Sequence, residues 1–357
     1  MEENLILAIN PGSTSTKLGL YEGRDEIFTE KVVHKAEELK DFEKITDQMD
    51  LRLDYILDFL KQKNVNLNKL NAVVGRGGLL KPIPGGTYSV NDKMAEDLKA
   101  GLQGEHASNL GGLLARAIGE KAGCPSFIVD PVVVDELKPE ARLSGLPELD
   151  RRSIFHALNQ KAVARKYAEE KEAKYKDLNI IVAHLGGGIS VGIHHKGKVI
   201  DVNNALSGEG PFSPNRSGGL PTLDLFELCY SDKFKYNELK KKLVGNGGVM
   251  AYLGTNDMEE VEEKVKNGDE KARLVFDSMV YQTGKEIGSL APIVNGNIDV
   301  IILTGGIAYS EYFTERVSNM VKYIAPVKIY PGEEELAALA SGAFRVLSGK
   351  EEAKVYE

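Results

Sequence analysis

The sequence predicts an α/β protein made of two domains that share one topology. A strand, a glycine-rich turn and a second strand open the chain at 5–28, and a similar run returns at 178–202. The second strand of each copy has an inner glycine, Gly19 or Gly192. Such internal similarity predicts a repeated structural unit, and strands alternate with helical segments elsewhere. The alternative is that two unrelated hairpins look alike in a chain with 37 glycines.

The first half of the chain alternates strands and helices. Apolar residues at helical spacing, with no proline or glycine, predict one long amphipathic helix over 36–63. The remaining elements are strands at 4–10, 17–23, 25–34 and 125–134, a short strand entering a glycine loop at 71–78, and helices at 90–102, 109–123 and 150–175.

The second half begins with the repeated hairpin, in which Lys196-Gly197 predicts a tight turn between two strands. The rest of this half is predicted to be helical over 222–295. A strand, a Gly-Gly turn and a helix follow over 298–324, and then a strand at 326–331 and a helix at 333–349.

The composition narrows the classes of function. The chain has 357 residues, which is long for a single domain, and its net charge of -8 argues against a nucleic-acid groove. Two cysteines, Cys124 and Cys229, cannot build a disulfide framework. No apolar run has the length of a membrane span, and no signal peptide is recognisable, so a cytoplasmic enzyme without membrane partners is expected.

Three glycine turns follow apolar strands and are candidates for binding phosphate. They contain Gly12 with the hydroxyl run 13–16, Gly186 to Gly188, and Gly305-Gly306. Glycine lets backbone N–H groups approach an anion closely. The first turn leads into another strand and no helix, so it is not a Walker loop, and no dinucleotide fingerprint is present. The three turns together suggest one nucleotide shared between two domains.

Several longer motifs resemble those of the acetokinase family of carboxylate kinases, and in particular its butyrate-specific branch. They are "INPGSTSTKLGLYE", "GEGPFSP", "NRSGGLPTLDL", "AHLGGGISV", "LTGGIAYSE" and "PGEEELAALA". The resemblance implies two ribonuclease-H-like domains of the acetate and sugar kinase/Hsc70/actin superfamily, with an ATP cleft between them. The implied domains are 1–153 with 336–357, and 154–335.

The resemblance also implies an activity. ATP would phosphorylate butyrate directly and reversibly, by in-line transfer, to give butyryl phosphate and ADP, with Mg²⁺ as the metal and a homo-oligomer as the assembly. Acetate, propionate or a branched-chain acid remains open as the main substrate, because one methylene changes binding by only about 1–3 kcal/mol. A nucleotide-dependent binding module of the same fold is the alternative from another class.

Four residues are implied to take part in catalysis. Arg216 would contact the carboxylate and the transferring phosphoryl group, since a guanidinium fork matches both. Arg76 would be a second clamp, and Asn10 would contact the phosphoryl group. His156 would stabilise the transition state, although a buried structural histidine is an equal reading of the residue alone. Four further histidines are predicted to be surface or packing residues: His34, His106, His194 and His195.

The remaining implied roles concern the nucleotide and the metal. Lys17 is implied to add positive charge near the phosphates, but it could instead point to solvent. Asp257 is implied to contact the ribose, but its role could instead be structural. The expected Mg²⁺ ligands are Asp130 and Glu334, with the register of the glutamate within 333–335 open by one residue. An acidic run at a helix start also compensates the helix dipole. The candidate nucleotide-binding residues are Ser13, Ser15, Lys17, His184, Gly186, Gly187, Gly188, Gly248, Asp257, Gly305 and Gly306.

Overall fold

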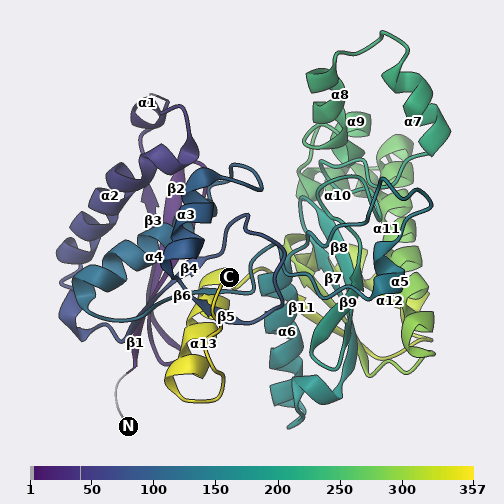
Figure 1. Cartoon of the computed structure of the whole chain (residues 1–357). Coiled ribbons are helices and arrows are strands. Elements are labelled where there is room, and N and C mark those ends of the chain that lie inside the picture. Colours follow the sequence, from purple (N-terminus) through teal and green to yellow (C-terminus); the bar gives the residue numbers. More distant parts are fainter. Residues whose placement is uncertain (1–3, 41) are drawn as a thin grey trace. The chain divides into compact units, whose positions relative to one another are not determined.

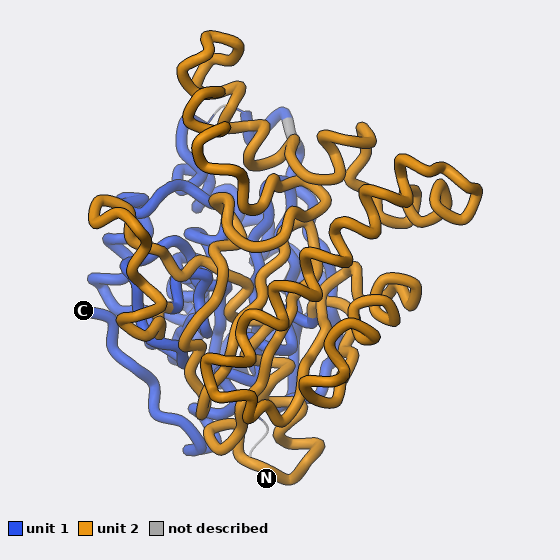
Figure 2. The backbone as a smooth tube through the Cα atoms, turned by 90° about the vertical axis from the view of Figure 1, so that its right-hand side faces the viewer, with its two compact units in different colours: residues 1–134, 334–357 blue, residues 135–333 orange. Residues whose placement is uncertain are grey.

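A computed structural model describes residues 4–40 and 42–357 (Figure 1). The chain divides into two compact units, residues 1–134 with 334–357 and residues 135–333 (Figure 2). The chain therefore passes from one unit to the other twice, after Val134 and after Glu333. The domain limits at 153/154 and 335/336 stay a prediction.

The first unit is built on a six-stranded sheet in the order β3-β2-β1-β4-β6-β5. β1, β2 and β3 form an antiparallel meander, while β4 and β6 extend the sheet in parallel with β1. The strands are β1 Leu5–Pro11, β2 Ser15–Glu22, β3 Asp25–Val33, β4 Ala72–Arg76, β5 Thr87–Ser89 and β6 Ser126–Val129.

The second unit is built on a five-stranded sheet in the order β11-β10-β7-β8-β9. β7, β8 and β9 form the antiparallel meander, and β10 and β11 run parallel to β7. Lys196 and Gly197, both at positive φ, make the tight turn between β8 and β9 that the sequence predicts. The strands are β7 Asn179–Leu185, β8 Ile189–His195, β9 Lys198–Val202, β10 Val300–Gly305 and β11 Val327–Pro331.

The two sheets confirm the predicted repeat. Each places its first strand between an antiparallel hairpin partner and a parallel strand. The inner glycines occupy equivalent positions, because Gly19 pairs with Ala8 and Gly192 pairs with Val182. By the same register Asn10 corresponds to His184, and their cross-strand partners Lys17 and Ser190 correspond to each other.

Helices cover both faces of the first sheet. α2 and α4 pack on the face that carries Leu7 and Ile9. Successive strand residues point to opposite faces, so Ile6 and Ala8 face the other side, where α13 contacts β1 and β4. The helices of this unit are α1 Ala36–Leu39, η1 Ile45–Gln48, α2 Met49–Gln62, η2 Leu67–Lys69, α3 Asp92–Ala100, α4 Asn109–Ala122 and α13 Glu335–Leu347.

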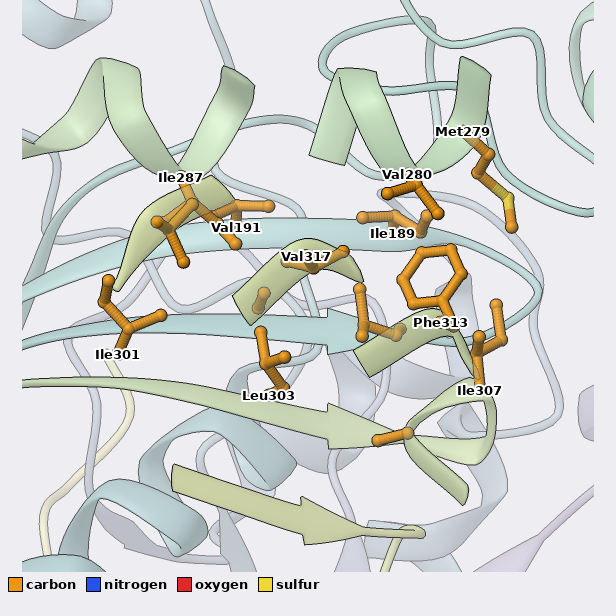
Figure 3. Close-up of a cluster of buried hydrophobic side chains, with 14 of the residues drawn as sticks. Ile189, Val191, Met279, Val280, Ile287, Ile301, Leu303, Ile307, Phe313 and Val317 are labelled. Carbon is orange, nitrogen blue, oxygen red and sulfur yellow. The ribbon is translucent and has the colours of Figure 1, made fainter. Parts of the chain in front are cut away.

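The second unit repeats this layering. Figure 3 shows β8 and β10 residues such as Val191 and Leu303 packing against Ile287 of α11 and Val317 of α12. α6 covers the opposite face through Val163 and its neighbours. The helices are α5 Pro139–Arg142, α6 Ala157–Glu170, η3 Tyr175–Asp177, α7 Thr222–Cys229, α8 Tyr236–Leu243, α9 Gly248–Leu253, α10 Met258–Lys266, α11 Glu270–Leu290, η4 Ala291–Val294, η5 Gly306–Tyr309 and α12 Glu311–Val321.

The prediction of one continuous helix over 36–63 is wrong. The segment is divided into α1, the 3₁₀ turn η1 and α2. The Tyr55 hydroxyl donates a hydrogen bond of 2.7 Å to Glu38 Oε2. In a continuous helix these two residues would lie about 25 Å apart, at 1.5 Å per residue. The chain must therefore fold back between them, which a periodicity pattern does not reveal.

Two predicted boundaries also shift. β6 ends at Val129 rather than near 134, because Asp130 takes φ +37° and leaves the strand conformation. α6 begins at Ala157, directly after His156, rather than near 150. Both corrections place a candidate site residue at the end of an element.

Candidate active site

In the first unit Asn10 lies near the end of β1 and is 6% exposed. Its side-chain amide donates a hydrogen bond to Glu335 Oε2, at the first turn of α13. Lys17, opposite Asn10 on β2, is exposed. The two side chains lie on the same face of the sheet, but the amide is buried against α13 and the ammonium group is exposed to solvent, where a charged ligand can meet it.

Arg76 ends β4 and reaches the same carboxylate. Its Nη1 lies 2.9 Å from Glu335 Oε1 and 3.5 Å from Asn10 Oδ1. Close packing of β4 on α4 holds the backbone here, since a Cβ on Gly75 would lie 2.0 Å from the carbonyl oxygen of Gly111. The structure therefore brings Asn10 and Arg76 together around Glu335, a partner that the sequence analysis did not identify.

The glycine turn of the first unit is held by Arg52, which the sequence analysis also missed. This side chain is 0% exposed, and its guanidinium donates to the carbonyl oxygens of Gly12 and Ser13, both at 2.8 Å. It donates further to Ser15 O and to Gln48 Oε1. Among the ion pairs of residues 4–40 and 42–357, none involves Arg52. A buried positive charge thus lies directly behind the turn that carries Ser13 and Ser15.

His34 lies beside the same turn and is 2% exposed. Its Nε2 is 2.8 Å from Thr16 Oγ1, and its backbone N–H donates to Thr14 O. Burial, together with the charge of Arg52, lowers the pKa of His34 to about 4, against a smaller opposing effect of Glu38. His34 is therefore neutral near pH 7. The prediction that it packs is consistent with this position.

The two candidate metal ligands of this unit differ in setting. Asp130 is 1% exposed, takes a left-handed backbone conformation, and accepts a hydrogen bond from Gly86 N at 2.7 Å. Strained conformations of non-glycine residues cluster at functional sites. Glu334 is exposed, and no side-chain hydrogen bond or ion pair to it occurs in the described part of the chain. Both supply carboxylate oxygens, the donor type that Mg²⁺ prefers.

In the second unit two candidate histidines lie face to face. The rings of His156 and His184 are stacked, with centroids 3.7 Å apart and planes 10° apart. His184 is 1% exposed, its Nδ1 lies 2.8 Å from Asn159 Oδ1, and its Nε2 lies 3.0 Å from Glu333 Oε1. His184 corresponds to Asn10 of the first sheet, and each contacts a glutamate of the acidic run 333–335.

Arg216 lies beside the glycine turn of the second unit. Its Nη1 donates to Ala205 O at 2.5 Å, and a Cβ on Gly188 would lie 1.9 Å from the same nitrogen. Burial lowers the pKa of Arg216 from its ordinary value, yet a guanidinium stays charged in proteins. None of the ion pairs found between described residues includes Arg216. The arrangement leaves a half-buried cation available to a carboxylate or phosphoryl group.

Glycines around Arg216 have packing roles. Gly248 is at φ +59°, and a Cβ there would lie 1.8 Å from Ser213 O, so this glycine lets α9 approach the 213–216 loop. Ser213 Oγ in turn donates to Gly187 O at 2.6 Å. The amide of Asn215 lies 3.3 Å from the position of a Cβ on Gly187 and fills the space beside it.

The other nucleotide candidates are more scattered. Gly305, at φ +92°, packs against Leu185 O, whereas a Cβ on Gly306 would meet open space. Gly306 opens the short turn η5 and not a long helix. Asp257 caps α10 by accepting hydrogen bonds from Glu259 N and Glu260 N. The structure thus gives Asp257 the structural role, and its contact with a nucleotide stays a prediction.

No cluster of three or more histidine, cysteine or acidic side chains suited to a metal ion occurs in residues 4–40 and 42–357. Across the same residues, every helix is too short or too polar to cross a membrane.

The two sheets and the loops at their strand ends define the two-domain actin-like kinase fold. Solved structures agree: acetate kinase of Porphyromonas gingivalis has a TM-score of 0.81 at 22% identity, over 96% of this chain and all of its own. Propionate kinase of Francisella tularensis has a TM-score of 0.74 at 18% identity, over 95% and 98%.

The family follows from sequence comparison. The model of the acetokinase family matches residues 147–353. Butyrate kinases 2 and 1 of Clostridium acetobutylicum are 57% and 56% identical over 352 residues, and each alignment covers 99% of both chains. The chain belongs to the acetokinase family, which confirms the resemblance recognised in the sequence.

Proposed function

We propose that this protein is an ATP-dependent butyrate kinase. The observation that carries the proposal is the identity of 57% with a butyrate kinase over 99% of both chains. In the reaction a carboxylate oxygen of butyrate attacks the γ-phosphorus of ATP. The bond to the β–γ bridging oxygen breaks, and ADP leaves with its electron pair. The products are butyryl phosphate and ADP, and the reaction is reversible.

Phosphoryl transfer of this kind depends on positioning and charge rather than on covalent chemistry of the protein. Arg216 is assigned to the carboxylate and the phosphoryl group, because its guanidinium is charged and pairs with no described carboxylate. Arg76 and Asn10 are assigned to phosphoryl oxygens, and Glu335 holds both. His156 is assigned as a hydrogen-bond donor to the developing negative charge.

The glycine turns are assigned to the nucleotide. Backbone N–H groups at Ser13 and Ser15 and at the turn from Gly186 to Gly188 would meet phosphate oxygens, with Lys17 adding charge. His184, Gly305 and Gly306 are assigned to the same ligand. Gly248 and Asp257 are assigned to the adenosine side of the nucleotide. They would act indirectly, because Gly248 packs against the 213–216 loop and Asp257 caps α10.

Mg²⁺ is part of the proposal. A Mg²⁺ ion usually takes one or two protein carboxylates and completes its shell with waters and phosphates. Asp130 and Glu334 fit this donor set, and Glu334 is the residue of the acidic run whose carboxylate has no partner among the described residues. When bound, the ion would neutralise charge on the phosphates.

The test is an acyl-phosphate assay with Mg-ATP, hydroxylamine and acids from acetate to valerate, including isobutyrate. Hydroxylamine converts an acyl phosphate to a coloured hydroxamate. The proposal expects a maximum at butyrate and loss of product in Arg216→Ala, while the exposed Arg273→Ala on α11 retains activity. A maximum at acetate or at isobutyrate would reassign the substrate, and no hydroxamate with any acid would reject the kinase.

A cytoplasmic location and a homo-oligomeric state belong to the proposal by family resemblance alone. Light scattering on the purified protein measures the number of subunits, and a mass equal to one chain would remove the oligomer from the proposal.

A further inference from the structure

A buried chain of hydrogen bonds leads from the interior of the second unit to His156. Its side chains come from η3, β8, α6 and the residue before α6. Figure 1 labels β8 and α6 in the second unit. Three of its members, Gln160, Ser190 and His194, are 0% exposed. We call this set the tautomer relay, and its members in order are Tyr175, His194, Gln160, Ser190 and His156.

One backbone carbonyl sets the direction of the relay. Gln160 Nε2 lies 3.0 Å from the main-chain oxygen of Ser190, which can only accept a hydrogen bond. The NH₂ group of the amide must therefore face Ser190, and its Oε1 must face the other way. The second proton of the NH₂ group is donated to Ser190 Oγ at 2.9 Å.

Toward the site, this arrangement determines the proton on His156. Ser190 Oγ accepts from Gln160 Nε2 and from the backbone N–H of His156 at 3.5 Å, which uses both of its lone pairs. Its own proton therefore points to His156 Nδ1 at 2.9 Å. Nδ1 of His156 is then an acceptor. A neutral imidazole carries one proton, so that proton is on Nε2.

Toward the interior, donors and acceptors alternate in the same way. Gln160 Oε1 accepts from His194 Nε2 at 3.0 Å, so His194 also carries its proton on Nε2. His194 Nδ1 then accepts from the hydroxyl group of Tyr175 at 2.7 Å. Each described contact thus joins one donor to one acceptor, and turning the amide of Gln160 over would place its oxygen against the carbonyl oxygen of Ser190 in a buried site.

The inner glycine of β8 provides the space that the relay needs. A Cβ on Gly192 would lie 2.9 Å from Gln160 Oε1. An added methyl group would have to displace the amide oxygen from His194. The equivalent glycine of the first unit, Gly19, faces the ring of Tyr21 instead.

We propose that the tautomer relay holds His156 with its proton on Nε2, so that this nitrogen donates a hydrogen bond to the transferring phosphoryl group. Tyr175, His194, Gln160 and Ser190 are positioning residues that act through His156. The opposite tautomer would present a lone pair on Nε2 to negatively charged oxygens, which repels them. This inference rests on the proposed kinase function for its catalytic consequence, but the tautomer itself can be measured without activity.

The primary experiment is ¹⁵N NMR of the full chain labelled at its six histidines, at pH 7.5. Long-range ¹H–¹⁵N correlations distinguish the two neutral tautomers, and His156→Gln identifies the resonances of His156. The proposal expects Nε2–H on both His156 and His194. A proton on Nδ1 of His156, or a mixture of the two tautomers, would overturn it.

Variants test the consequence for catalysis. Ser190→Ala removes the hydroxyl group that points to Nδ1, so the single tautomer is lost. Replacement of such supporting partners typically reduces activity about 10- to 100-fold, and here the loss is expected in kcat with KM for both substrates little changed. Gly192→Ala, which leaves Ser190 in place, is expected to shift the tautomer in the same direction.

The matched control is His195→Gln. His195 follows His194 on β8, points to the opposite face, and contacts Asn179 outside the relay. It is expected to retain the wild-type tautomer and kcat. Equal losses of kcat in His195→Gln and Ser190→Ala would overturn the proposal. A wild-type protein with Nε2–H on His156 but no kinase activity would reject the proposed function and leave the relay intact.

Discussion

The glycine turns after β1 and β7 occupy equivalent places in the two sheets, but different groups hold them. Arg52 of α2 donates to two carbonyl oxygens of the first turn at 2.8 Å and carries a buried charge. The second turn adjoins two uncharged side chains, Ser190 and Gln160, which connect to His156. Equivalent topology therefore does not specify equivalent support, because each sheet receives its partners from a different helix.

The supports of the two turns differ in charge. Carbonyl dipoles stabilise the guanidinium of Arg52, but no described carboxylate neutralises it. Positive charge behind a loop favours an anion in front of it. The second turn has its cation, Arg216, beside Gly188 rather than behind the loop. We therefore expect the stability and ligand binding of the first turn to depend on charge and pH. Those of the second turn should depend on how closely its neighbours pack.

The largest expected effect concerns the second turn. Gly188→Ala places a methyl group 1.9 Å from Arg216 Nη1 and must displace the guanidinium. Loss of one preorganised donor typically reduces kcat about 10²- to 10³-fold, and steady-state kinetics with butyrate measures it. Gly288→Ala on α11, where a Cβ meets nothing within 4 Å, is the control and should retain activity. Unchanged kcat in Gly188→Ala would remove Arg216 from the reaction.

Removing the buried charge tests the first turn. Arg52→Met leaves the carbonyl groups of Gly12 and Ser13 without their charged donor, which should lower the free energy of unfolding by about 3 kcal/mol. Denaturant unfolding measures this change, and KM for ATP should rise in the same variant. Arg52→Lys separates charge from geometry, since it keeps the first and loses the planar fork. Equal stability of Arg52→Met and wild type would contradict the inference that Arg52 holds the first turn through its carbonyl groups.

The first turn should also be sensitive to acid. The pKa of His34 is about 4 in the folded protein and near 6.5 when unfolded. Below pH 6.5 the unfolded chain binds a proton that the folded protein does not, so stability is fully present above pH 6.5 and falls as the pH decreases toward 4. The expected loss between pH 7 and 4.5 is about 2 kcal/mol.

Unfolding by urea across this pH range measures the acid effect. His34→Gln should remove that part of the pH dependence. If the variant and the wild type lose stability in parallel, the acid sensitivity originates elsewhere in the protein.

The smallest expected effect on stability is at Lys17. This side chain is exposed, so Lys17→Met should change the free energy of unfolding by less than about 0.5 kcal/mol. Its effect should appear instead as a higher KM for ATP. The difference in KM between the variant and the wild type should become smaller as ionic strength rises, because salt screens the charge of Lys17. Lys69→Met, in η2, is a control of the same chemistry. A KM equal to that of wild type would make Lys17 an ordinary surface lysine.

Much of the fold could be predicted because it depends on local pattern. The hairpin with its inner glycine appears twice in the sequence, and the two sheets have corresponding strand orders. The division of residues 36–63 could not be predicted, since both halves have helical periodicity and the fold-back depends on contacts such as Tyr55 with Glu38. Periodicity reports which residues are apolar and not where a helix must stop.

The candidate site divides in the same way. Motifs indicated Arg216, Arg76 and the glycine turns, because those residue types suit anions wherever the chain places them. Arg52 was missed although a signal was present: it shares the buried face of α2 with Ile56 and Leu60, at a spacing of four residues. A charged residue on an apolar stripe is a position to examine. Gln160 gives a similar signal on the buried face of α6.

The sequence by itself determined the repeated topology and the family, and it named the residues proposed to meet a phosphate, since these follow from local patterns and motifs. Only the tertiary structure decided which side chains support them. Glu335 reaches Asn10 across 325 positions of the chain, and Gln160 reaches Ser190 across 30. Such contacts form because buried polar groups must find partners wherever folding places them. No local pattern records which partner that will be.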